Sequence, residues 1–376
     1  MLAVLKKAMR LLSRPVRVSR DRRGVVVQAY RGFGSETEAF VMGRVLRQPR
    51  FDLGTRKNTF DRDLVDILRR FLRRGVRGAV VEARLGGATR RIGADRDGYF
   101  KARLDVGLAA QDAGPWRTMK IRVVEPADCR AAADAEVFVP PRGARFVVIS
   151  DIDDTVMHTG VANRLAMLWR LFAEGAKSRV AFPGVAAFYS ALHDGPSGGE
   201  GNPMLYVSRA PWSLYEVLDA FFNLHDIPVG PILFLREWGL TIQRPLPRRA
   251  ENHKLDLIRD MLSVYRDRPF VLIGDSGQHD PEIYSRVVRE NPGRVLAVYI
   301  RKVSGNARRA DEIEGLAREV AAAGASLLLA QDSSAMAEHA AERGLISRAA
   351  LARVAAEKRD QEGSGPADRR ASALTR

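Results

Sequence analysis

The chain has 376 residues, of which 46% are hydrophobic and 28% are charged, and its formal net charge is +16. This length exceeds what one hydrophobic core usually organises, so it predicts two folded units with terminal extensions. The apolar content excludes a largely disordered chain, and no uninterrupted apolar run approaches the length that spans a bilayer. The single cysteine, Cys129, excludes an intrachain disulfide and a multi-cysteine zinc site, which favours a reducing cytoplasm.

Residues 1–20 are predicted to form a basic amphipathic helix. On a helical wheel, apolar side chains such as Leu5 and Leu12 fall on one half, whereas Lys6 and Arg10 fall on the other. The segment lacks the continuous apolar stretch and the cleavage site of a secretory signal, so we expect it to be retained. Two interpretations stay open: the helix lies on an anionic membrane surface, or it packs against the domain behind it.

Residues 21–141 are predicted to form a β-rich sandwich domain, because short β-like runs alternate with turn residues. The pair Gly86-Gly87 predicts a hairpin, and the residues from Asp95 to Gly98 predict a turn. Apolar residues at helical spacing between 60 and 72 predict one helix inside this region. The expected strands, which we take to be antiparallel, cover residues 25–30, 40–46, 79–85, 99–104, 118–124 and 137–139.

After Pro140 and Pro141 the pattern changes to apolar strands that alternate with longer helical segments. This alternation predicts an α/β domain with a doubly wound parallel sheet over residues 145–345. In such sheets, reacting groups gather outside the carboxyl ends of the strands. Residues 346–376 are predicted to form a C-terminal helix and a disordered tail. The expected parallel strands cover residues 146–149, 204–207, 232–235, 270–273, 295–300 and 326–329.

Three carboxylates follow the first of these strands within four positions: Asp151, Asp153 and Asp154. So much negative charge at a strand end is costly unless a cation offsets it. Oxygen ligands in a compact loop suit Mg²⁺, which also takes substrate phosphate and water as ligands. The alternative is an acidic turn that caps the next segment through hydrogen bonds.

A hydroxyl and an ammonium follow later in the chain. Ser208 comes directly after the strand at 204–207, where its hydroxyl can donate to a phosphate oxygen or cap a helix. Lys254 stands at the head of a predicted amphipathic helix, in a chain that otherwise prefers arginine. A compact ammonium at that position can act as a point charge toward phosphate, although a solvated lysine is the plain alternative.

A second acidic strand end follows the apolar run at 270–273. Asp275 and Asp280 are five positions apart, and Gly274 and Gly277 are expected to let the backbone turn sharply between them. The two carboxylates can then face one cation. Two acidic strand ends with a hydroxyl and a lysine between them favour one shared site over coincidence.

In this order, the motifs resemble those of the haloacid-dehalogenase-like phosphatases. More narrowly, they resemble the catalytic domain of the fungal actin-patch phosphatidate phosphatase and its bacterial relatives. The resemblance covers roughly residues 145–345, and the β-rich region before it matches only loosely. The motifs are DIDDT at 151–155, YVSRAPW at 206–212, FLREWG at 234–239, HK at 253–254 and GDSGQHDPEIY at 274–284.

The resemblance implies catalysis through an aspartyl-phosphate intermediate. Asp151 would be the nucleophile, since a carboxylate that is ionised at neutral pH needs no base to activate it. Asp153 would protonate the leaving oxygen and then activate the water that hydrolyses the intermediate. The implied ligands are Ser208, Lys254 and Thr155 for phosphate, and Asp151, Asp153, Asp275 and Asp280 for Mg²⁺.

The expected substrate is phosphatidate or a related lipid phosphate. Residues 161–172 are unusually apolar and would form either a lipid-facing lid or an ordinary core helix. We expect a cytoplasmic enzyme that makes peripheral contact with the anionic inner membrane surface. Two alternatives stay open: a phosphatase of nucleic-acid ends or soluble phosphomonoesters, which would use the basic surface for capture, and a non-catalytic anionic-lipid binder.

Overall fold

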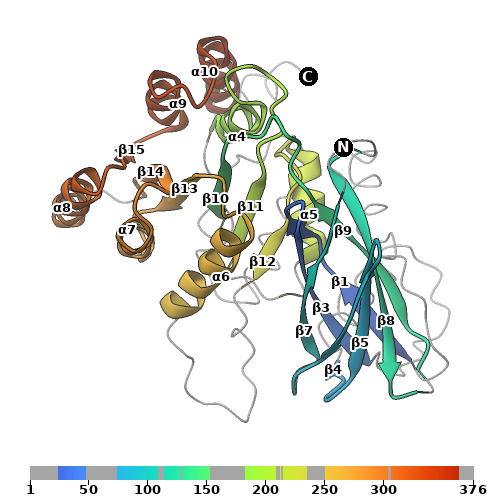
Figure 1. Ribbon diagram of the computed structural model, residues 1–376. Coiled ribbons are helices and arrows are strands. Elements are labelled where there is room, and N and C mark those ends of the chain that lie inside the picture. The colour runs from blue at the N-terminus through green and yellow to red at the C-terminus, as the bar shows by residue number, and fades with distance from the viewer. Residues whose placement is uncertain are drawn as a thin grey trace, which may run out of the picture.

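The computed structural model describes residues 24–47, 74–108, 114–127, 129–152, 183–208, 212, 215–234, 250–303 and 306–363. Within them, a β-rich sheet lies beside an α/β unit (Figure 1). The helices expected at 1–20 and 60–72, the apolar segment at 161–172 and the expected tail beyond 363 lie outside the described residues. No helix of the described ranges is both long enough and apolar enough to cross a membrane.

The α/β unit is built on a six-stranded parallel sheet, as the sequence predicts. Its strand order is β12-β11-β10-β13-β14-β15, so the chain reverses its direction of travel across the sheet between β10 and β13. The carboxyl ends of these two neighbours therefore form a topological switch point. The finer assignment as a doubly wound haloacid-dehalogenase-like fold stays a prediction. The strands are β10 (Val147–Asp151), β11 (Met204–Ser208), β12 (Ile232–Phe234), β13 (Phe270–Asp275), β14 (Val295–Arg301) and β15 (Leu327–Ala330).

Two groups of helices pack against this sheet. Helices α4, α9 and α10 contact one another, and α7 contacts both α6 and α8 (Figure 1). Helix α10 belongs to the same hydrophobic core, because Ala350 and Val354 are buried in it. The helices are α4 (Val185–Asp194), α5 (Tyr215–Leu224), α6 (Ala250–Val264), α7 (Asp280–Glu290), α8 (Ala307–Ala322), α9 (Ser333–Glu342) and α10 (Arg348–Gly363).

The β-rich region forms one nine-stranded sheet around its own apolar core. Alternation explains its strands: along β8, Met119, Ile121 and Val123 are buried, whereas Lys120 and Arg122 are exposed. The hairpin predicted at Gly86-Gly87 joins β5 to β6. The strands are β1 (Val25–Ala29), β2 (Gly32–Gly34), β3 (Glu38–Arg47), β4 (Arg74–Gly75), β5 (Val80–Leu85), β6 (Ala88–Gly93), β7 (Tyr99–Asp105), β8 (Trp116–Glu125) and β9 (Ala132–Phe138).

The expectation of a purely antiparallel arrangement is wrong at one strand. Strand β2 pairs with β9 in parallel, so the sheet is mixed. Strand β2 has only three residues, and two of them are glycine. It therefore shows no alternation of apolar and polar residues from which its pairing direction could be predicted. Gly32 is required by space, because a Cβ atom there would lie 2.1 Å from the carbonyl oxygen of Phe40.

The two sheets share a packed interface. The rings of Tyr30, from the β-rich region, and Trp212, from the α/β unit, lie 4.3 Å apart between centroids. Next to them, Arg31 pairs with Asp219 of α5. Tyr30 and Trp212 both belong to the core of the α/β unit, so the β-rich region covers part of that core. The domain limits at 141 and 345 stay predictions.

Candidate active site

The site lies where β10 and β13 end side by side. Asp151 is the last residue of β10 and Asp275 is the last residue of β13. The two strands are paired in parallel, with Ser150 opposite Ile273, so their carboxyl ends meet at the switch point of the sheet. Both aspartates are buried. The structure thus brings together the two acidic strand ends that lie more than 120 positions apart in the sequence.

Lys254 of α6 links two of the carboxylates. Its Nζ atom lies 3.0 Å from Oδ1 of Asp151 and 2.5 Å from Oδ1 of Asp280. The side chains of all three residues are at most 2% exposed. A buried charge is stable only when it is paired, and here one ammonium serves two carboxylates. The lysine that the sequence analysis singled out therefore contacts the predicted nucleophile.

Asp151, Asp275 and Asp280 form a group that could hold a metal ion. One carboxylate oxygen from each lies within 4.8 Å of the others. Oδ1 of Asp275 accepts hydrogen bonds from the backbone N–H groups of Gly277 and Gln278, at 2.7 and 3.0 Å, and these bonds fix the orientation of its carboxylate. A set of oxygen donors fits a hard cation such as Mg²⁺. The carboxylate ligands indicate a hard divalent cation but do not distinguish Mg²⁺ from other ions of this class.

Asp280 is held from two sides. Its Oδ1 atom pairs with Lys254, and its Oδ2 atom accepts a hydrogen bond of 3.2 Å from the backbone N–H of Asp275. Both contacts favour an orienting role for this carboxylate alongside the metal-ligand role predicted from the motif. Asp280 also begins α7, where a negative charge is favourable at the helix N-terminus.

Gly274 serves a different purpose from the one expected. The backbone does turn between Asp275 and Asp280, over residues 276–279, but neither Gly274 nor Gly277 has a positive φ angle, so this turn does not need a left-handed glycine conformation. Instead, a Cβ atom on Gly274 would lie 2.3 Å from Oδ2 and 2.7 Å from Cβ of Asp280. Because glycine has no Cβ atom, position 274 leaves room for the Asp280 side chain, which is part of the cluster.

Ser208 ends β11, the neighbour of β10 on its other side. Asp151 pairs in register with Val207, and the backbone N–H of Ile152 donates to the Val207 carbonyl at 3.1 Å. The buried Ser208 is thus the next residue along the adjacent strand end. Asp153 and Thr155 lie outside the described residues, so their predicted roles stay predictions.

Two tyrosines that received no role in the sequence analysis lie at the base of the site. The Tyr284 hydroxyl donates to the Ile273 carbonyl at 3.0 Å, and its ring centroid lies 5.5 Å from Nζ of Lys254. Burial, and then the charges of Asp280, Asp151 and Asp275, raise the pKa of Tyr284 well above its usual value. Tyr189 shares a hydrogen bond of 2.6 Å with Ser150, and burial raises its pKa to about 12. Both therefore stay neutral beside the carboxylates.

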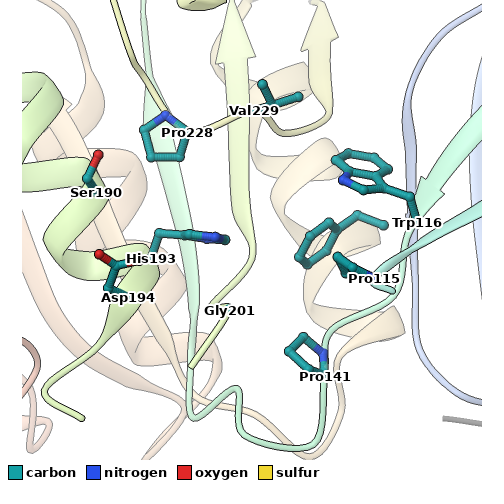
Figure 2. A pocket seen from close by; sticks show the side chains of 10 residues that line it. Pro115, Trp116, Pro141, Ser190, His193, Asp194, Gly201, Pro228 and Val229 are labelled. Carbon is teal, nitrogen blue, oxygen red and sulfur yellow. The ribbon is translucent and has the colours of Figure 1, made fainter. Parts of the chain in front are cut away.

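A groove of about 390 Å³ lies elsewhere, between the β-rich sheet and α4 (Figure 2). Figure 2 shows Trp116 on one wall and His193 and Asp194 of α4 on the other. Gly201, which comes before β11, lines the groove, whereas Ser208 ends that strand. The groove is therefore at the amino ends of the parallel strands, and the carboxylate cluster is at their carboxyl ends.

Comparison with known proteins finds similarity over the segment of the chain that contains this cluster. Residues 146–302 match the family model described as the catalytic domain of phosphatidate phosphatase APP1. Phosphatidate phosphatase APP1 of Saccharomyces cerevisiae is 34% identical over 170 residues, which are 45% of this chain and 27% of that protein. An uncharacterized protein of Schizosaccharomyces pombe is 28% identical over 42% of this chain and 25% of its own length.

The chain thus spans about a quarter of the length of the curated relatives that it matches. Among solved structures, a carbohydrate acetylesterase from Xanthomonas citri has 12% identity and a TM-score of 0.25, over 76% of this chain and 71% of that one, a likeness too low to carry an argument. The matched residues contain Asp151, Ser208, Lys254, Asp275 and Asp280. Residues 146–302 are therefore similar to the catalytic domain of phosphatidate phosphatase APP1, which confirms the resemblance predicted from the motifs.

Proposed function

We propose that the chain is a Mg²⁺-dependent phosphomonoesterase that acts through an aspartyl-phosphate intermediate on phosphatidate or a related lipid phosphate. The observation that carries the proposal is the buried cluster of Asp151, Asp275 and Asp280 around Lys254. It lies inside the segment that matches a phosphatidate phosphatase catalytic domain. Burying several charged groups together costs desolvation free energy that ion pairing does not fully offset, so such a cluster contributes little to stability. This favours a catalytic role.

Asp151 would attack the phosphorus atom, and the bond between phosphorus and the leaving oxygen of the substrate would break. Its carboxylate becomes the acyl phosphate, and water later releases inorganic phosphate from it. Asp153 would give a proton to the leaving oxygen and then take one from that water. When bound, Mg²⁺ would supply positive charge beside the phosphoryl oxygens. Asp151, Asp153 and Asp275 would be its ligands, with Asp280 as an orienting residue or alternate ligand.

Lys254 and Ser208 would hold the phosphoryl group. The Lys254 ammonium lies beside Asp151, the predicted nucleophile. From there its positive charge would act on a phosphoryl oxygen, where negative charge must be stabilised during transfer. Ser208, at the neighbouring strand end, can donate its hydroxyl proton to a second oxygen. Thr155 is proposed to fix the phosphate-binding loop.

The lipid assignment has three supports. One similar protein bears the name phosphatidate phosphatase. The sequence also predicts a basic amphipathic helix at 1–20 and an apolar segment at 161–172, next to the nucleophile in the chain. A net charge of +16 suits the anionic inner surface of the membrane, where we propose that the enzyme acts from the cytoplasm.

The test is phosphate release from phosphatidate in mixed micelles, with Mg²⁺ and with excess chelator. The wild type should release phosphate only with Mg²⁺, and Asp151→Asn should lower the rate by at least about 10³-fold, because the amide is not a nucleophile. When the reaction is quenched with acid, the wild-type protein should carry covalently bound phosphate and the Asp151→Asn variant should not. Phosphate release by Asp151→Asn at the wild-type rate would sink the mechanism.

The second candidate is a phosphatase of nucleic-acid ends or soluble phosphomonoesters. The same net charge of +16 favours it, since a basic surface concentrates polyanions. A substrate panel separates the two. Faster turnover of a DNA 3′-phosphate than of micellar phosphatidate, together with steep inhibition by salt, would replace the lipid by nucleic acid and leave the roles of Asp151 and Lys254 unchanged.

A further inference from the structure

Arg309 reaches the site from outside the segment that resembles known catalytic domains. It lies in the first turn of α8, beyond the matched residues 146–302. Its Nε atom donates to the Ser276 carbonyl at 3.1 Å, and its Nη2 atom donates to the Gln278 carbonyl at 2.9 Å. The same guanidinium pairs with both carboxylate oxygens of Glu282, at 2.5 and 3.0 Å.

These contacts span the loop between the two carboxylates of β13 and α7. Ser276 follows Asp275 directly, and Gln278 gives its own N–H to Oδ1 of Asp275 while its carbonyl accepts from Arg309. Glu282 lies in the first turn of α7, two positions after Asp280. The guanidinium of Arg309 therefore holds the loop at three points: near its start at Ser276, in its middle at Gln278, and at the beginning of the following helix through Glu282.

The chemistry of these contacts requires arginine. A planar guanidinium offers five N–H donors in a rigid fork, whereas a lysine ammonium cannot reach two carbonyls and a bidentate carboxylate together. The Arg309 side chain is 19% exposed, so the pairing with Glu282 is partly shielded from water.

We propose that Arg309 is a positioning residue for the cation site, holding the loop 275–282 so that Asp275 and Asp280 face Asp151. The inference rests on the proposed Mg²⁺-dependent function. Residues that orient metal ligands typically change metal affinity by 10- to 100-fold when they are replaced. A purely structural residue would instead lower the stability of the fold and leave the affinity for Mg²⁺ unchanged.

Arg308 is the matched control. It is the neighbouring residue in the same helical turn, its side chain is 89% exposed, and its ion pair is with Glu312 of the same helix at 3.4 Å. The variants are Arg309→Lys, which keeps the charge and loses the fork, Glu282→Gln, which weakens the same contact from the other side, and Arg308→Lys. The changes at 309 and 282 are conservative, so that the full chain is expected to fold in both variants.

Two measurements test the proposal on the full chain. The first is the Mg²⁺ concentration at half-maximal hydrolysis of p-nitrophenyl phosphate, and the second is the rise in Tm that Mg²⁺ produces in thermal unfolding. Arg309→Lys should raise the first at least tenfold and reduce the second, with Glu282→Gln changing both in the same direction. Arg308→Lys should match the wild type in both.

The outcomes separate this inference from the proposed function. If Arg309→Lys lowers Tm in the absence of Mg²⁺ but keeps the wild-type dependence on Mg²⁺, Arg309 is structural and the inference is overturned. If the wild type is stabilised by Mg²⁺ but hydrolyses no phosphate ester, the proposed function fails and the Tm series still decides the role of Arg309. Absence of both Mg²⁺ effects in the wild type overturns both.

Discussion

Each of the two sheets of this protein carries a cluster of paired opposite charges, and the two clusters differ in position. In the parallel sheet, Lys254 lies between Asp151 and Asp280 at the ends of strands. In the β-rich sheet, Glu82 lies in the middle of β5 and is approached by three arginines. Their shortest distances are 2.8 Å for Arg122, 3.5 Å for Arg84 and 3.6 Å for Arg91.

Burial separates these clusters more than charge does. The Lys254 side chain is 1% exposed, whereas the three arginines are between 58% and 69% exposed. Glu82 and its arginines lie side by side on the outward face of neighbouring strands. The Glu82 side chain is only 8% exposed, but water reaches its arginine partners and screens their charges. In the other cluster, Lys254 and both of its carboxylate partners are buried. Similar residues are therefore partly solvated in one sheet and fully buried at the candidate site of the other.

The largest expected effect is that of Lys254→Met, which breaks the buried cluster. Two carboxylates would lose their shared counter-charge, so the free energy of unfolding should fall by about 3–5 kcal/mol, and phosphatase activity should be lost. Urea unfolding without Mg²⁺ measures the first, and Mg²⁺ should recover part of the loss. Lys101→Met is the control, because its ion pair with Asp260 is exposed. Equal, small losses for both variants would remove the contrast between the clusters.

Gly274→Ala tests how tightly the cluster is packed. The added Cβ would meet Asp280, which Lys254 and the Asp275 amide hold in place, so we expect a loss of about 1–3 kcal/mol and weaker activity. Gly315→Ala in α8 is the control. No atom lies within 4 Å of a Cβ there, and alanine favours a helix, so stability should stay the same or rise by about 0.5–1 kcal/mol. A harmless Gly274→Ala would show that Asp280 can move aside.

The same contrast explains what the sequence could predict. The six parallel strands are mainly apolar, and β10, β11 and β13 end at Asp151, Ser208 and Asp275, so both the strands and the candidate site could be predicted from local pattern. In the β-rich region the alternating strands were also predictable, because one face of each is buried. Strand β2 was not, since it is three residues long and its pairing with β9 depends on contacts more than 100 positions apart.

Within the site, sequence pattern found the residues but not all of their contacts. Asp151, Asp275 and Asp280 stand out because charge is unusual next to apolar strands, and Lys254 stands out because the chain otherwise prefers arginine. Arg309 does not stand out, because the chain has many arginines on helices and nothing in the local sequence distinguishes this one. Its role depends on the two backbone carbonyls that accept its hydrogen bonds, and these are known only from the folded structure. The space requirement at Gly274 likewise depends on the position of Asp280, which appears only once the chain is folded.

A smaller effect is expected from Tyr189, at the base of the site. Burial raises the pKa of its hydroxyl to about 12, from 10 in the unfolded chain. Above pH 10 the unfolded chain releases this proton first, so stability is complete below pH 10 and falls as the pH rises toward 12. At pH 11 the loss is about 1.4 kcal/mol.

Tyr189→Phe removes this proton and should flatten that part of the pH profile. It should also cost about 1 kcal/mol at neutral pH, because the hydrogen bond with Ser150 is lost. Urea unfolding of both proteins between pH 8 and pH 11 gives the comparison. Other buried tyrosines also lose stability above pH 10, so the difference between variant and wild type is the informative quantity. Parallel pH profiles would show that Tyr189 does not contribute.

The smallest expected effect is that of a change in the cluster around Glu82. Glu82→Gln keeps the shape of the side chain and a hydrogen-bond acceptor for Arg122, while it removes the charge that faces three arginines. Because those arginines are more than half exposed, solvent already screens their mutual repulsion, and the free energy of unfolding should change by less than about 1 kcal/mol. Raising the salt concentration should reduce even this difference, since the charges lie within reach of the ions. A loss as large as that of Lys254→Met, unaffected by salt, would mean that position in the sheet does not separate the two clusters, and that the β-rich fold requires the charge of the buried Glu82.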